Sequence, residues 1–100
     1  MHMCGGPKDA NPHDPAVVSI AEYLVGQLNT SNEPNIASLC LRPPVVLVSI
    51  KTATTQVVAG INYVLCIDIQ TEGDVQGLKA KVYHRPWGDS VTEISEIALE

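Results

Sequence analysis

The chain has 100 residues, of which 45% are hydrophobic and 17% charged, so it is long enough for one compact soluble domain and too short for two independent cores. Its 11 acidic and 6 basic side chains give a net charge of −5, and the basic residues form no run, which argues against a nucleic-acid-binding groove. No segment is apolar over the length of a signal peptide or a membrane span, so we expect a cytoplasmic protein with a single domain, residues 1–100.

The first 13 residues have the composition of a connecting segment. They contain Gly5-Gly6-Pro7 and Asn11-Pro12 and little apolar content, which predicts an extended, flexible N-terminal arm over residues 1–13. Order in this arm would have to come from a partner or from a short pairing at a sheet edge. Asp14 followed by Pro15 predicts the start of a helix, because the carboxylate can accept free amides and proline loses no hydrogen bond at the first helical position.

Apolar residues then recur at three- and four-residue spacing and predict one buried helical face, formed by Val17, Ile20, Ala21, Leu24 and Leu28. Gly26 lies within this pattern. Because glycine costs about 1 kcal/mol relative to alanine inside a helix, either the helix weakens at Gly26 or a strand approaches closely there, and we favour the close approach. The turn-forming stretch from Asn29 to Pro34 is expected to end the helix.

From Val45 onward the hydrophobic periodicity becomes strand-like. Residues 45–56 form a first run, and residues 61–69 form the clearest strand, because an apolar residue stands at every second position. Residues 71–77 and 85–90 have turn compositions. Between these turns, Leu78, Ala80 and Val82 alternate with Lys79 and Lys81, and after the second turn the segment VTEISEIAL closes the meander. One helix followed by an antiparallel meander predicts an α+β fold in which the helix covers the apolar face of the sheet.

The expected turn Gln56-Val57-Val58-Ala59-Gly60 is unusually apolar for a segment that should face water. Exposed apolar clusters commonly mark binding sites, whereas Val57 and Val58 could instead tuck under the end of the sheet. Composition alone does not choose between these interpretations.

The sequence QVVAG at 56–60, followed by the strand INY, resembles a motif of the cystatin superfamily of cysteine-protease inhibitors. Gly5-Gly6 and Pro86-Trp87 extend the resemblance over nearly the whole chain, in the same order and spacing. The short opening MHMCGG is similar to that of the disulfide-free stefins, the type 1 cystatins. Two features depart from stefins: Pro86-Trp87 is more typical of secreted and plant cystatins, and the ending IALE lacks an aromatic residue.

This resemblance implies a cystatin fold, with an antiparallel sheet wrapped around one helix, and a reversible, tight-binding competitive inhibitor of papain-like proteases such as cathepsins. It implies a monomer without a cofactor and without enzyme activity. The arm and two hairpins would fill the protease cleft through Met3, Cys4, Gly5, Gly6, Gln56, Val57, Val58, Ala59, Gly60, Pro86 and Trp87. The alternative is a cystatin-fold interaction module that has lost inhibition.

Straightening of a strained turn at Gln56 to Gly60 would merge two strands and let the helix and first strand swap between chains, which gives a domain-swapped dimer as a further state. Ser31-Asn32-Glu33 resembles the stretch with which some secreted cystatins inhibit legumain, so Asn32 is a candidate second-site residue. An ordinary helix-ending loop is the alternative interpretation.

The cysteines at positions 4, 40 and 66 are an odd number at wide spacing, which favours free thiols over a disulfide framework. Cys40 and Cys66 are expected to be packing residues. His2 and Cys4 could be read as metal ligands, but they lack a third ligand and a closed site, so no metal is expected.

Overall fold

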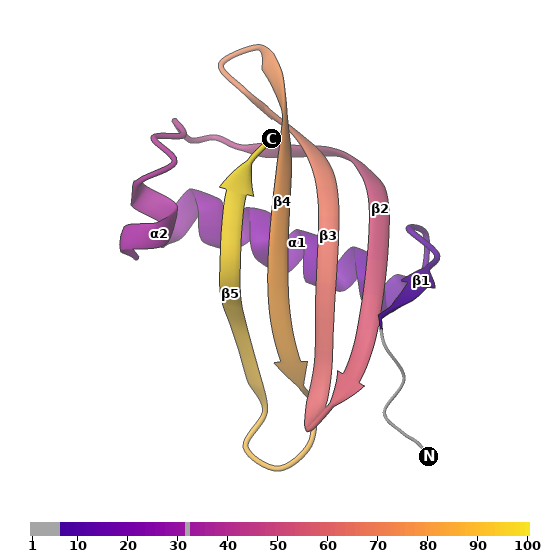
Figure 1. Cartoon of the computed structure of the whole chain (residues 1–100). Helices are drawn as coiled ribbons and strands as arrows, with labels where there is room; N and C mark the ends of the chain where they lie inside the picture. The colour runs from indigo at the N-terminus through magenta and orange to yellow at the C-terminus, as the bar shows by residue number, and fades with distance from the viewer. Residues whose placement is uncertain (1–6, 32) are drawn as a thin grey trace.

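The computed structural model describes residues 7–31 and 33–100. Within this part of the chain, five antiparallel strands form one sheet in the order β1-β2-β3-β4-β5, and helix α1 lies across one face of it (Figure 1). The elements are β1 (Lys8–Ala10), α1 (Pro15–Thr30), α2 (Pro34–Ala37), β2 (Val46–Val58), β3 (Gly60–Thr71), β4 (Asp74–Arg85) and β5 (Val91–Leu99). The predicted α+β fold with an antiparallel sheet around one long helix is confirmed.

Helix α1 begins where the sequence predicts. Pro15 is its first residue, and an Asp14 carboxylate oxygen accepts a hydrogen bond from the Ala16 amide at 2.9 Å. This bond satisfies one of the amides that the first helical turn leaves without a partner. The buried face contains the predicted residues and Val25 in addition.

The expectation of a close strand approach at Gly26 is wrong. Gly26 lies on the exposed face of α1, and a Cβ atom built on it would have no neighbour within 4 Å. The helix continues past this glycine to Thr30, and a second helix, the short α2, follows where no helix is predicted from the sequence. Pro34 begins α2, and Ile36 anchors it in the core.

The core lies between α1 and the inner face of the sheet. Its sheet side is formed by alternate residues of β3 and β4, which pair across the strands as Tyr63 with Val82, Leu65 with Ala80, and Ile67 with Leu78. All six side chains are at most 5% exposed. The period of two that the sequence shows in both strands therefore corresponds to one buried face.

The turn between β3 and β4 is shorter than the predicted segment 71–77. Glu72 and Gly73 both have positive φ, at 52° and 84°, and Thr71 pairs directly with Asp74. Two successive left-handed residues close a two-residue hairpin whose twist matches that of the strands. Residues 74–77, which have turn-like composition, therefore belong to β4.

Two further segments differ from the sequence-based expectations. Residues 8–10 of the expected flexible arm form β1 and pair with residues 53–55 of β2, the short edge pairing that the sequence left open. Cys40 is not a packing residue, because it is exposed and has φ 57°; Cys66 is half-buried on β3. Over residues 7–31 and 33–100, no helix has the length and apolar character needed to span a membrane.

Candidate functional site at the hairpin end of the sheet

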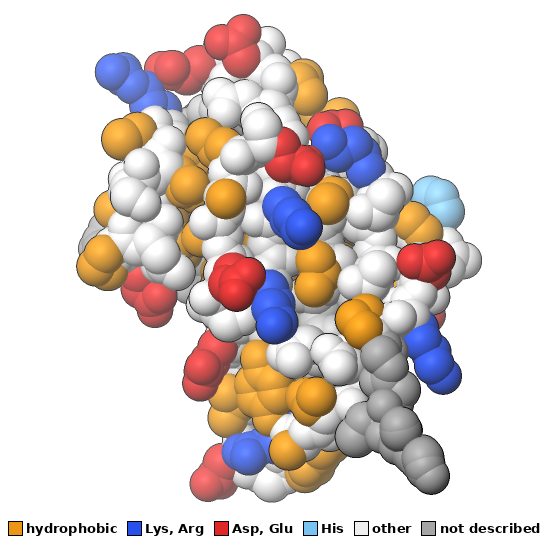
Figure 2. Space-filling view, viewed as in Figure 1, with side chains coloured by type: hydrophobic (Ala, Val, Ile, Leu, Met, Phe, Trp, Pro, Cys, Tyr) orange, Lys and Arg blue, Asp and Glu red, His pale blue; other side chains and the backbone are white. Residues whose placement is uncertain are grey.

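The β2–β3 hairpin and the β4–β5 loop lie together at one end of the sheet, and the β3–β4 turn lies at the other (Figure 1). We call residues 57–60 together with residues 86–90 the hairpin end. Antiparallel order along the sheet produces this arrangement, because every second connection returns to the same end. In the space-filling view, hydrophobic side chains gather at this end of the molecule (Figure 2).

The first hairpin is tighter than predicted. Gln56, Val57 and Val58 belong to β2, and Val58 pairs with Gly60, so Ala59 alone forms the tip. The side chains of Val57 and Val58 are 66% and 41% exposed. The interpretation in which the two valines tuck under the end of the sheet is therefore excluded, and the apolar tip faces solvent.

The local backbone requires a glycine at position 60, and the end of the Tyr83 side chain lies against it. Its φ of 136° lies in a region that residues with side chains rarely adopt. A Cβ atom on Gly60 would also lie 2.6 Å from the Cε1 and hydroxyl oxygen of Tyr83 on β4. The Tyr83 hydroxyl donates a hydrogen bond to the Ala59 carbonyl, so this side chain lies against both the tip residue Ala59 and Gly60. Tyr83 is not among the site residues predicted from the sequence.

The second hairpin carries the exposed aromatic side chain of the site. Trp87 is 55% exposed, and Pro86 beside it is also exposed. The loop is closed by Gly88, with φ 65°, and by Arg85, whose guanidinium donates to the Asp89 carbonyl at 2.9 Å. Trp87 is thus presented to solvent at the same end of the sheet as Val57 and Val58.

Four predicted arm residues, Met3, Cys4, Gly5 and Gly6, lie outside the described residues, as does Asn32. Their roles stay predictions. The direction of β1 bears on the arm, because Lys8 pairs with Thr55 and Ala10 with Ala53. The chain therefore enters β1 from the hairpin end of the sheet.

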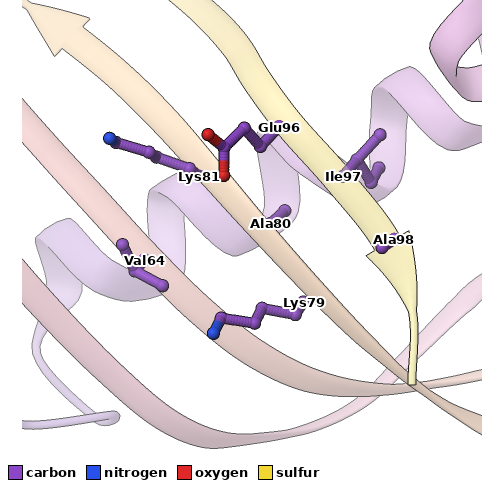
Figure 3. Close-up of a pocket in the computed structure, with 7 residues that line it drawn as sticks. All are labelled: Val64, Lys79, Ala80, Lys81, Glu96, Ile97 and Ala98. Atoms are coloured by element: carbon purple, nitrogen blue, oxygen red, sulfur yellow. The ribbon is translucent and has the colours of Figure 1, made fainter.

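The outer face of the sheet carries a shallow depression away from the hairpin end. Val64 of β3, Lys79 and Lys81 of β4, and Glu96 of β5 line it together with Ala80, Ile97 and Ala98 (Figure 3). It is an open hollow between strand side chains. In the part of the chain that the structure describes, no three His, Cys, Asp or Glu side chains gather closely enough to hold a metal ion.

The resolved pKa shifts have structural causes away from the hairpin end. Burial, with the negative charge of Asp14 as a smaller contribution, raises the pKa of Tyr63. Burial, together with Glu33 and Glu93, raises the pKa of Tyr23. Hydrogen bonds to Glu100 and Asp68 raise the pKa of Lys51. The hairpin end itself offers mainly apolar side chains and backbone groups, with Asp89 and Ser90 beside them, which suits binding.

Fold and site together define an α+β protein in which one long helix covers the sheet and two hairpins present exposed apolar side chains at one end of it. The chain belongs to the cystatin family, since the model of the cystatin domain matches residues 5–87. Members of this family are cysteine-protease inhibitors, which agrees with a non-enzymatic function. The resemblance to the cystatin superfamily is thereby confirmed, and the stefin-like subgroup stays a prediction.

Solved cystatin structures share this fold at low sequence identity. A salivary cystatin from the soft tick Ornithodoros moubata is 21% identical, with a TM-score of 0.74 and coverage of 98% of this chain and 99% of that chain. Mialostatin, a gut cystatin from the hard tick Ixodes ricinus, is 16% identical, with a TM-score of 0.72 and coverage of 95% and 97%. Dimeric human cystatin F is 20% identical, with a TM-score of 0.72 and coverage of 99% and 89%. No curated protein sequence matches the chain.

Proposed function

We propose that this protein is a reversible, tight-binding competitive inhibitor of papain-like cysteine proteases of the cathepsin type. The observation that carries the proposal is the exposure of Val57, Val58 and Trp87 at one end of the sheet. Large apolar side chains that stay uncovered on a small domain commonly mark an interaction site. The cleft of a papain-like protease is the partner that the family relationship supports.

The hairpin end supplies binding energy without reacting. Trp87 is already partly covered, so docking can remove only about half of the ~150–250 Å² that a tryptophan buries, which is worth about 2–3 kcal/mol before the costs of association. Val57 and Val58 are β-branched and lose little side-chain freedom on docking. In this mechanism the inhibitor occupies the cleft and keeps substrate out, and none of its residues acts as an acid, base or nucleophile.

The N-terminal arm would add contacts to the same cleft. Gly5 or Gly6 has no side chain, so the backbone there can pass close to the catalytic thiol of the protease. Met3 and Cys4 would then reach the recognition subsites beyond. The entry of the chain into β1 from the hairpin end supports this placement. We extend the proposal to a cytoplasmic, stefin-like monomer.

Titration of papain tests the proposal, with two matched valine variants. Val57→Asp places a charge at the hairpin end, on a valine that is 66% exposed. Val75→Asp is the control and places a charge at the opposite end of the sheet, on a valine that is 58% exposed. We expect stoichiometric inhibition by the wild type at nanomolar concentration, and an inhibition constant raised about 10- to 100-fold by Val57→Asp. Val75→Asp should leave the inhibition constant unchanged.

Absence of inhibition by the wild-type protein at micromolar concentration would remove the proposal and leave a cystatin-fold interaction module as the function. Equal losses from both valine variants would show that the hairpin end is not the contact surface. The same titration with Trp87→Ala separates the contribution of the second hairpin from that of the first.

A further inference from the structure

The side chain of Tyr83 reaches from β4 to the first hairpin of the site. Tyr83 lies on β4, four residues before Trp87, and pairs with Asn62 of β3 on one side and with Glu93 of β5 on the other. Its neighbour Val82 is fully buried, so strand alternation places Tyr83 on the outer face of the sheet. From there its hydroxyl donates to the Ala59 carbonyl at the tip of the first hairpin.

The Ala59 carbonyl lies where the β2–β3 ladder ends. Val58 pairs with Gly60, so Ala59 is the single residue between the paired positions and has no strand partner. A one-residue tip has few internal contacts that could fix the orientation of its peptide group. The Tyr83 hydroxyl supplies one such contact from a different strand, which ties the tip to the body of the sheet.

The Tyr83 ring and Gly60 also fit each other sterically. A Cβ atom at position 60 would lie 2.6 to 2.7 Å from the Cε1, Cζ and hydroxyl oxygen of Tyr83, well inside van der Waals contact. Two features therefore favour glycine at the end of the QVVAG sequence. One is the positive φ of Gly60, and the other is that the Tyr83 ring can take its observed position only if residue 60 has no side chain. Gly60 allows the positive φ next to Ala59, and Tyr83 binds the Ala59 carbonyl, so both residues influence the conformation of the tip.

We propose that Tyr83 is a positioning residue, which holds the Ala59 peptide so that Val57 and Val58 are presented to a partner in one fixed conformation. This inference rests on the proposed inhibitory function and names the residue that prepares its first hairpin for docking. A tip that is already ordered loses less conformational freedom on binding, so the hydrogen bond contributes to affinity although Tyr83 need not touch the protease.

The substitution Tyr83→Phe tests this role because it removes the hydroxyl and retains the ring. Tyr23→Phe is the matched control, since the Tyr23 hydroxyl also donates to a backbone carbonyl, that of Thr92 at 3.1 Å, and does so from helix α1. We expect Tyr83→Phe to raise the inhibition constant for papain about 3- to 10-fold, mainly through faster dissociation. Tyr23→Phe should leave the inhibition constant at the wild-type value.

Thermal unfolding separates positioning from a loss of stability. We expect the two variants to shift the unfolding midpoint by similar small amounts, while only Tyr83→Phe weakens inhibition. A wild-type inhibition constant and dissociation rate for Tyr83→Phe would overturn the positioning role. Equal weakening by Tyr23→Phe would also overturn it, because the effect would then follow general stability.

A second readout does not depend on inhibition. Amide spectra of the free protein should show that Tyr83→Phe shifts the resonances of residues 58–61 and speeds hydrogen exchange there, whereas Tyr23→Phe leaves them unchanged. If the wild type fails to inhibit papain, the proposed function fails and these spectra alone decide whether Tyr83 orders the tip. Unchanged resonances in Tyr83→Phe would refute that ordering, whatever the inhibition.

Discussion

Gly60 and Gly26 occupy opposite situations in the same fold. Gly60 has φ 136° and the Tyr83 ring directly beside it, whereas Gly26 lies on the exposed face of α1 with no atom near a would-be Cβ. Glycine inside a helix lowers stability relative to alanine when no neighbouring atom needs the space. Glycine at a left-handed backbone position is required, because residues with side chains rarely adopt that conformation. The two positions therefore respond oppositely to the same substitution.

We expect Gly60→Ala to destabilise the protein by about 1–3 kcal/mol, because the new methyl group requires an unfavourable φ and displaces Tyr83. Inhibition should weaken by at least about 10-fold, since the tip must move. Gly26→Ala is the control and should stabilise the helix by up to about 1 kcal/mol with inhibition unchanged. Urea unfolding and papain titration measure both effects, and an unaffected Gly60→Ala protein would contradict this account of the tip.

At the scale of elements, the end of helix α1 is joined to the start of β2 by one side chain. The Asn29 amide nitrogen donates to the Val45 carbonyl at 2.9 Å, and its oxygen accepts from the Val45 amide at 2.7 Å. The same nitrogen also lies 3.2 Å from the Val25 carbonyl of the helix. The Asn29 side chain thus pairs with the backbone amide and carbonyl of Val45 as a neighbouring strand would. Val45 is buried, with 3% of its surface exposed, so these groups need a partner within the protein.

We expect Asn29→Ala to destabilise the protein by about 2–4 kcal/mol, because it leaves the Val45 amide and carbonyl unpaired at a buried position. Thr30→Ala is the control: its hydroxyl donates to the Gly26 carbonyl at 2.8 Å on the exposed side of the helix. That loss should cost no more than about 0.5–1 kcal/mol. Equal free energies of unfolding for the two variants, measured in urea, would rule out the strand-like role of Asn29.

At the scale of the whole molecule, charge and burial set the response to alkaline pH. Lys51 lies 3.4 Å from an Asp68 oxygen and 3.2 Å from a Glu100 oxygen, a network that joins β2, β3 and the C-terminal residue on the outer face. These hydrogen bonds raise the pKa of Lys51. Burial raises the pKa of Tyr63 in the core and that of Tyr23 on the helix. All three shifts have the same sign.

A pKa that is higher in the folded state means that the folded protein holds the proton more tightly. The associated stability is fully present below the unfolded-state values, 10.0 for tyrosine and 10.5 for lysine, and is lost as pH rises through the folded values. We therefore expect the contribution of these groups to the free energy of unfolding to be constant from neutral pH to about pH 9 and to decrease above pH 10. Tyr63→Phe should reduce this decrease, since phenylalanine cannot ionise. An identical alkaline decrease in wild type and Tyr63→Phe, followed in urea, would contradict the assignment.

Features that depend on neighbours along the chain are readable from the amino-acid sequence alone. Asp14-Pro15 specified the start of α1, the three- and four-residue spacing specified its buried face, and alternation specified the inward residues of β3 and β4. The QVVAG and Pro86-Trp87 sequences also indicate the cystatin family without reference to the fold. Capping and periodicity are local, so a single sequence contains them in readable form.

Contacts between segments that are distant in the sequence become visible only in the folded chain. Tyr83 meets Ala59 across 24 positions, and Asn29 meets Val45 across 16, and neither pairing has a local signal. The same holds for the open surroundings of Gly26, the exposure of Cys40 and the pairing of β1 with β2. Composition also left open whether Val57 and Val58 were covered, because burial depends on which surfaces the fold brings together, and the folded sheet leaves them in solvent.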